Sequence, residues 1–160
     1  MIARVALLLT IVPSATALAQ TANRCPWFSS GSAAKILGGN ISLVANADGN
    51  WDGSCHFIRS DEGKPASIDI LIGKVDTHPC PQGSVKINAL GNEALQCSHP
   101  TLGSQHVDVI AGRMRDVYFV VSMTDVPNAT RQLPSDSHLS GPFGASLLER
   151  VAEQVVGNLY

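Results

Sequence analysis

The chain has 160 residues, of which 44% are hydrophobic and 15% are charged, and its formal net charge at pH 7 is −2. Its basic residues are scattered rather than clustered, which argues against nucleic-acid binding. Beyond the N-terminus no apolar run approaches the roughly 20 residues that span a bilayer, so no transmembrane helix is expected.

The N-terminus has the features of a secretory signal peptide over residues 1–19. Arg4 supplies a positive charge, Val5 to Val12 form an apolar run, and Ala17-Leu18-Ala19 is a small-x-small cleavage signal. No cysteine follows this signal directly, so no lipid anchor is expected. The sequence therefore predicts a soluble, extracytoplasmic protein, periplasmic or secreted, with residues 20–160 as its single domain.

The chain has four cysteines, Cys25, Cys55, Cys80 and Cys97. In an exported protein this number implies two disulfides, and sequence alone allows three connectivities. We favour pairing neighbours along the chain, Cys25 with Cys55 and Cys80 with Cys97. On loop-entropy grounds each bridge would stabilise the fold by roughly 3–4 kcal/mol.

The first predicted element is a short helix over residues 33–37. Ser29, Ser30 and Ser32 are N-cap candidates, and Gly38-Gly39 stops the helix because glycine adopts the left-handed conformation at low cost. Its expected buried residues are Trp27, Phe28, Ile36 and Leu37.

Three antiparallel strands are predicted next, over residues 40–45, 54–59 and 67–75. Turn residues separate them, and the third strand has Ile68, Ile70 and Ile72 on one side and Asp69 and Leu71 on the other. From 76 to 103 three prolines weaken the pattern, although 85–87 and 94–97 could each form a short strand.

A hairpin is the central predicted feature, with strands over 106–110 and 114–123 and a turn at Ala111-Gly112-Arg113. Val117, Phe119, Val121 and Met123 share one apolar face of its second strand. A polar loop runs from Thr124 to Gly141, and a loop this long is mobile or used for binding. The last element, an amphipathic helix over 142–158, is expected to cover the apolar face.

These elements predict an α+β fold. An antiparallel sheet of about five to six strands would carry a short N-terminal helix and a longer C-terminal helix on one face. The chain also resembles a group of exported bacterial domains of unknown function, many of them lipoproteins with a PsbP-like α+β fold. Four features carry this resemblance: Cys25 with Ala33 to Gly38, Cys55-His56-Phe57, Ala89 to Ala94, and Tyr118 to Val121. It implies a fold and an extracytoplasmic location, and no catalytic residue.

Two motifs suggest metal binding, and both also have structural interpretations. Asp48 to Gly53 matches the first half of a calcium loop, but Arg59 stands where a bidentate glutamate belongs, so a hairpin loop is favoured. His78, Cys80, Cys97 and His99 could hold zinc or copper. In an oxidising compartment the two cysteines would more often form a disulfide. No metal site and no cofactor are therefore predicted.

Catalytic motifs are weak. There is no Gly-x-Ser-x-Gly elbow, and Ser140 to Gly144 has its glycines at the wrong offsets. His56, His106 and His138 could act as bases, but no local pattern marks a nucleophile beside them. Gly91-Asn92-Glu93 is interpreted as a turn. No catalytic residue is predicted.

The sequence thus favours an exported, non-catalytic binding or accessory domain whose partner is a protein or a small apolar ligand. We expect the ligand on the sheet face that carries Ile110, Tyr118 and Val120. The alternatives are an extracytoplasmic hydrolase with a site assembled only in three dimensions, and an inhibitor of an extracellular enzyme.

Overall fold

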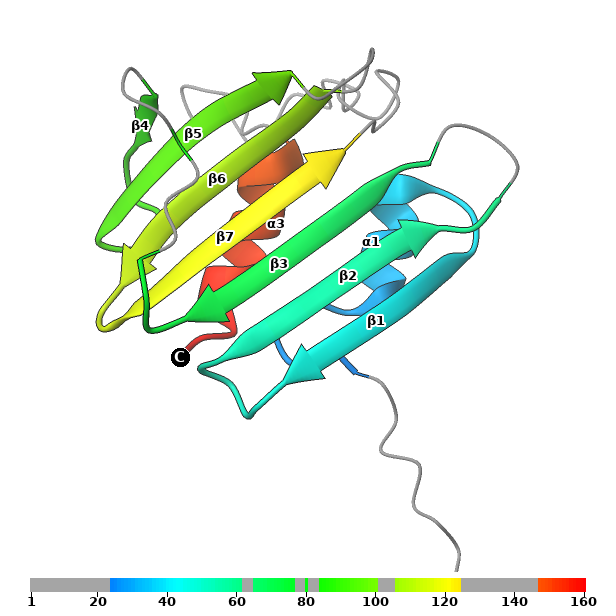
Figure 1. Ribbon diagram of the computed structural model, residues 1–160, viewed down its shortest axis with the longest axis horizontal. Helices are drawn as coiled ribbons and strands as arrows, with labels where there is room; N and C mark the ends of the chain where they lie inside the picture. Colours follow the sequence, from blue (N-terminus) through cyan, green and yellow to red (C-terminus); the bar gives the residue numbers. More distant parts are fainter. Residues whose placement is uncertain (1–23, 62–64, 77–79, 81–83, 101–105, 125–146) are drawn as a thin grey trace, which may run out of the picture.

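A computed structural model describes residues 24–61, 65–76, 80, 84–100, 106–124 and 147–160 (Figure 1). The signal peptide predicted over 1–19 lies outside them. The elements, in chain order, are α1 (Ser30–Leu37), β1 (Ile41–Ala47), β2 (Gly53–Arg59), β3 (Ser67–Gly73), β4 (Val85–Ile87), β5 (Glu93–Pro100), β6 (His106–Met114), β7 (Val117–Thr124) and α3 (Leu147–Gly157).

The described strands form one sheet of seven strands in the order β1-β2-β3-β7-β6-β5-β4. Every neighbouring pair is antiparallel. The first three strands form the predicted meander, the last four form a second one, and the two meet where β3 pairs with β7 (Figure 1). We call this pairing the seam.

The predicted α+β fold with five to six strands is wrong. The sheet has seven strands, and its residues outnumber those of the two helices more than twofold in the described chain, so the fold is mainly β. The extra strands come from the proline-rich stretch. β4 has three residues at a sheet edge, where a short strand is tolerated, and Pro100 is the last residue of β5. The final helix begins at Leu147 in the described chain, and the loop and helix start predicted over 125–146 lie outside it.

The turn of the predicted hairpin is also misplaced. β6 continues through residues 111–113 to Met114, and the reversal falls at Arg115 and Asp116, with φ of +54° at Arg115. Gly112 is a strand residue opposite Phe119, whose ring lies over it. A Cβ atom at Gly112 would come within 2.6 Å of Phe119 Cζ and would also meet the Glu93 carbonyl. The glycine makes room for the ring rather than for a turn.

Apolar side chains of β3 and β7 face the core on both sides of the seam. The facing pairs are Ile68 with Met123, Ile70 with Val121 and Ile72 with Phe119. All of these side chains are at most 5% exposed, so the predicted apolar faces are confirmed. Burying a side chain of this size contributes roughly 1.5–3 kcal/mol.

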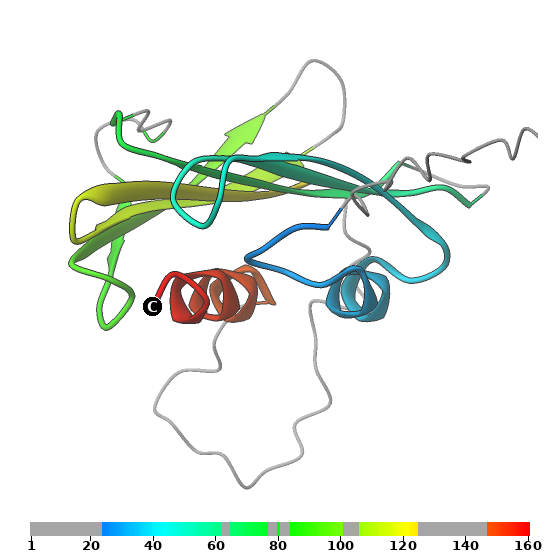
Figure 2. The ribbon, with the colours of Figure 1, turned by 90° about the horizontal axis from the view of Figure 1, so that it is seen from below.

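The two described helices cover the same face of the sheet, α1 over β1, β2 and β3 and α3 over β6 and β7 (Figure 2). α1 ends as predicted and begins three residues earlier than predicted, with one of the predicted serines as its N-cap: the Ser29 side chain accepts the Ser32 N–H, and Gly38 adopts φ of +73°. α3 buries an apolar stripe that includes Leu148, Val151 and Val155, which confirms its predicted role as a cover.

The structure has two disulfides, Cys25–Cys55 and Cys80–Cys97, the connectivity that the sequence favours. They lie on opposite faces of the sheet. Cys55 belongs to the core beneath the helices, whereas Cys97 pairs with Val109 on the face away from them, which we call the outer face. None of the helices in the described part of the chain is long and apolar enough to cross a membrane.

Substituting Gly112 tests the packing of Phe119 against β6. Gly112→Ala should lower the free energy of unfolding by about 1–3 kcal/mol, because the added methyl has no room. Gly157→Ala is the matched control: nothing lies within 4 Å of the position that its methyl would take, so stability should stay the same or rise by up to about 1 kcal/mol. Urea unfolding measures both. Equal stability of Gly112→Ala and the parent protein would contradict this packing.

Candidate functional site

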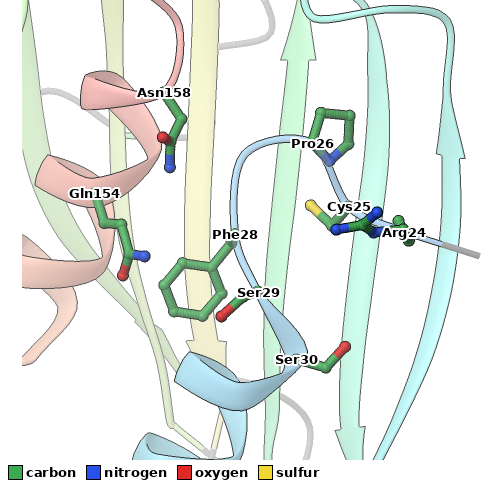
Figure 3. Close-up of a pocket in the computed structure, with 8 residues that line it drawn as sticks. All are labelled: Arg24, Cys25, Pro26, Phe28, Ser29, Ser30, Gln154 and Asn158. Atoms are coloured by element: carbon green, nitrogen blue, oxygen red, sulfur yellow. The ribbon is translucent and has the colours of Figure 1, made fainter.

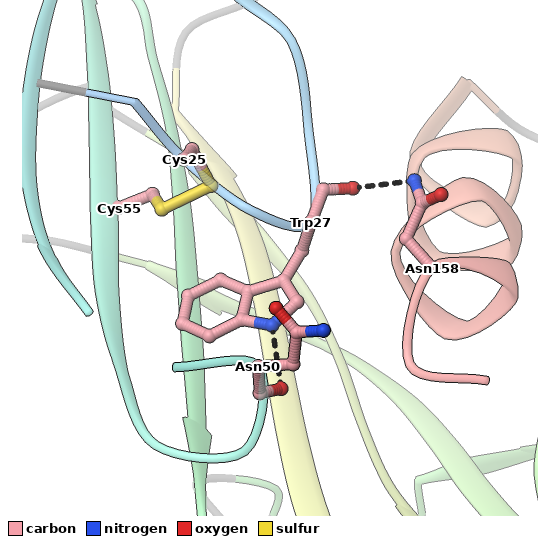
Figure 4. Close-up of a disulfide and its surroundings, with 5 residues drawn as sticks. All are labelled: Cys25, Trp27, Asn50, Cys55 and Asn158. Atoms are coloured by element: carbon pink, nitrogen blue, oxygen red, sulfur yellow. Dashed lines mark hydrogen bonds between the residues drawn. A yellow bond between two sulfur atoms is a disulfide. The ribbon is translucent and has the colours of Figure 1, made fainter. Parts of the chain in front are cut away.

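Residues 25–29 form a segment that runs beneath the sheet and is fixed to it at two points (Figure 4). Cys25 is bonded to Cys55 of β2, with 5.8 Å between their Cα atoms. Trp27 is fully buried, and its indole N–H donates to the Asn50 carbonyl in the β1–β2 loop at 2.8 Å. The Asp48 to Gly53 loop, which is predicted as a hairpin loop, thus supplies the acceptor that a buried indole needs.

The turn after α3 is hydrogen-bonded to this segment, and α3 itself is hydrogen-bonded to α1. The Asn158 amide donates to the Trp27 carbonyl at 2.9 Å (Figure 4), and the Gln154 amide donates to the Ser32 hydroxyl at 3.4 Å. Phe28 packs edge-on against Phe57 of β2, with ring centroids 5.6 Å apart. The segment therefore fills the space between sheet and helices.

Two hollows of about 370 Å³ and 340 Å³ open on the helical face of the protein. Gln154 lines both, so they adjoin, and together we call them the helix groove. The first is lined by Arg24, Cys25, Pro26, Phe28, Ser29, Ser30, Gln154 and Asn158 (Figure 3). The second is lined by Ser32, Lys35, Ile36, Leu147, Arg150, Val151 and Gln154. Each volume falls within the roughly 300–1,000 Å³ of small-molecule sites.

Figure 3 shows how the first hollow is built. Gln154 projects from α3 toward Phe28, Asn158 stands in the turn after α3, and Ser29 and Ser30 stand at the start of α1. Phe28 is 2% exposed and forms an apolar floor between these polar groups. The hollow thus offers hydrogen-bonding amides and hydroxyls around one aromatic surface.

The charged residues that line the helix groove in the described chain are all positive. Arg24 lines the first hollow, Lys35 and Arg150 line the second, and no carboxylate is among the described lining residues of either. All three cations are exposed. The acidic residues of α3, Glu149 and Glu153, do not belong to the lining. The groove is therefore locally positive in a chain whose net charge is −2.

The predicted ligand face does not exist as a single surface. Ile110 pairs with Val121 and is fully buried beneath the helices, whereas Tyr118 and Val120 lie on the outer face. Grouping Ile110 with them is wrong, because the strand runs on past the predicted turn. The side chain of Tyr118 is hydrogen-bonded to that of its cross-strand partner Arg113. The pKa of Arg113 is raised, chiefly by a hydrogen bond to Tyr118 and then by charge interactions with Tyr118, Glu93 and Asp116.

His56 lies on the outer face, where its Nδ1 contacts the Asp69 carboxylate across β2 and β3. The Ser67 hydroxyl donates to the other oxygen of Asp69 at 3.1 Å. This serine is bonded to the acid and not to the histidine, so the cluster lacks the nucleophile–base contact of a catalytic triad. His56 and Asp69 are 42% and 41% exposed, and they line neither hollow.

The remaining motifs have structural roles or lie outside the described chain. Asn92 is a turn residue, as predicted: its side chain accepts the Arg115 N–H at 2.8 Å. Cys80 and Cys97 are bonded to each other and supply no thiolate, and no group of three potential metal ligands occurs among the described residues. His78, His138 and residues 140–144 lie outside those residues. His106 begins β6 opposite Pro100.

The residues of the helix groove were not predicted from the sequence. Arg150 and Gln154 on α3 and Asn158 just after it recur at four-residue spacing, which is visible in the sequence, but such a stripe usually marks a solvated helix face. This stripe forms a groove wall because α1 and the 25–29 segment lie beside it. Both come from the other end of the chain.

Comparison with protein-family models, curated proteins and solved structures finds no match for this chain. The resemblance to exported PsbP-like domains therefore stays a prediction.

Removing each disulfide in turn tests whether Cys25–Cys55 fixes the wall of the groove. Each double substitution, Cys25→Ala with Cys55→Ala and Cys80→Ala with Cys97→Ala, should lower the free energy of unfolding by about 2–4 kcal/mol. Only the first should reduce the hydrogen-exchange protection of residues 27–32 relative to that of β7. Equal loss of this relative protection in both variants would contradict the assignment.

Proposed function

We propose that this protein is an exported, non-catalytic binding domain that holds its ligand in the helix groove. The observation that carries the proposal is the pair of hollows that adjoin at Gln154 between α1 and α3. Export is supported by the N-terminal sequence pattern and by the two disulfides, which persist in oxidising compartments.

The groups that line the groove support binding rather than catalysis. They are amides, hydroxyls, guanidinium groups and an ammonium group, which hold a ligand but are poorly suited to moving protons near neutral pH. In the described lining there is neither an imidazole nor a carboxylate, and the sulfur of Cys25 is held in a disulfide. The lining mixes these polar groups with apolar side chains, so it suits a ligand with both polar and apolar parts better than the small apolar ligand expected from the sequence.

A hydrolase is the second candidate, because His56 and Asp69 supply an oriented imidazole. Three features make it the weaker one. The pair is half-exposed, Ser67 is bonded to Asp69, and neither hollow adjoins His56. The cluster is better explained as a cross-strand polar pair on the outer face.

The groove can be located as a binding site by NMR. A panel of polar fragments and short capped peptides of all charge types is titrated into the ¹⁵N-labelled protein, and amide shifts are mapped. Members of the panel that bind should shift the amide signals of α1 and α3. Gln154→Trp should weaken their affinity at least about tenfold, because the larger side chain fills the junction of the hollows.

Leu71→Gln on the outer face is the matched control and should leave those affinities unchanged. Shifts confined to the outer faces of β3 and β7, or no shift with any member of the panel, would contradict the proposed site.

A further inference from the structure

The positive charges of the helix groove are spread along it rather than gathered at one point. Arg24 belongs to one hollow and Lys35 and Arg150 to the other, while Gln154 lies at their junction. A single small anion would meet only part of this set. An extended ligand with negative groups at intervals would meet all of it.

Between the charges, the groove offers amide groups. In the described part of the chain, the Gln154 Nε2 donates to Ser32 and the Asn158 Nδ2 donates to Trp27, and no described residue bonds to Gln154 Oε1 or Asn158 Oδ1. These carbonyl oxygens can accept N–H groups of an incoming chain. Side-chain amides match peptide groups, which present a donor and an acceptor at each residue.

The groove also offers apolar contacts. Ile36 and Leu147 line the second hollow and are partly exposed, whereas Val151 beneath them is buried. The methylene groups of acidic side chains could pack on these surfaces while their carboxylates reach the exposed cations.

We propose that the helix groove binds an acidic, extended peptide segment of another protein. This inference rests on the proposed function and names the class of its ligand. Because the cations are exposed, their attraction for carboxylates is screened, so the affinity falls as salt rises.

Three capped peptides, EAEAEA, QAQAQA and KAKAKA, test the inference in calorimetric titrations of the intact protein. EAEAEA should bind about tenfold more tightly than QAQAQA at low salt, since each exposed charge pair contributes up to about 1 kcal/mol, and KAKAKA should bind most weakly. The double substitution Lys35→Glu with Arg150→Glu should weaken the binding of EAEAEA about tenfold or more on the same grounds, and it should strengthen the binding of KAKAKA.

Lys74→Glu with Lys86→Glu is the matched control, because it changes the net charge equally at exposed positions outside the groove lining. An equal loss of EAEAEA binding in this control would overturn the inference, since net charge alone would then explain the effect. Tighter binding of an oligogalacturonate than of EAEAEA would overturn the peptide assignment.

The outcomes also separate this inference from the proposed function. If QAQAQA binds in the groove as tightly as EAEAEA, the groove is a binding site but the acidic preference is wrong. If EAEAEA leaves the amides of α1 and α3 unshifted while another member of the fragment and peptide panel shifts them, the inference is wrong and the proposed function holds; if no member shifts them, both are wrong.

Discussion

The seam between β3 and β7 is the constraint on which the remaining structure depends. Each meander has one apolar face, and neither could bury it alone; joined at the seam, they form a continuous core of isoleucines, valines and aromatic rings. A register slip of one residue would turn Ile70 and Val121 to the outer face, so this pairing is strongly specified by burial. Because α1 packs on the first meander and α3 packs on the second, the seam also brings the two ends of the folded part close together.

The helix groove is a consequence of this arrangement. α1 contacts β1, β2 and β3, and α3 contacts β6 and β7, so the two helices flank the seam instead of packing closely along their lengths (Figure 2). Trp27 and Phe28 of the 25–29 segment fill the space between these helices and the sheet, whereas the polar residues next to them remain at the surface. A disulfide and hydrogen bonds hold that wall in place, which lowers the ordering cost when a ligand binds.

Several parts of this structure follow from local sequence patterns. Ser29 and Gly38 bound α1, alternation predicts the core face of β3, and the stripe containing Leu148 and Val155 predicts the cover of the sheet. The errors arise where long-range packing overrides local preference. Gly112 marks a turn in the sequence, but its lack of a side chain admits the ring of Phe119. Consequently the predicted turn falls too early, and Ile110 was grouped with Tyr118 and Val120 on a face that it does not share.

The strand count failed for a related reason. β4 has only three residues and β5 has few with a strong strand preference, so the sequence offers 85–87 and 94–97 only as candidate short strands; their pairing depends on β6 and on the Cys80–Cys97 disulfide, which no local window displays. The groove was beyond prediction because its walls lie more than a hundred residues apart in the chain, as the Trp27–Asn158 and Ser32–Gln154 contacts show.

The central claim is that ligand and protein meet between α1 and α3, and photo-crosslinking tests it most directly. A benzophenone-bearing EAEAEA peptide is irradiated with the protein, and the attachment points are mapped by mass spectrometry. We expect adducts within residues 28–36 and 147–158, competed by unlabelled peptide. Adducts concentrated at Leu71, Val120 and their neighbours on the outer face would contradict the claim.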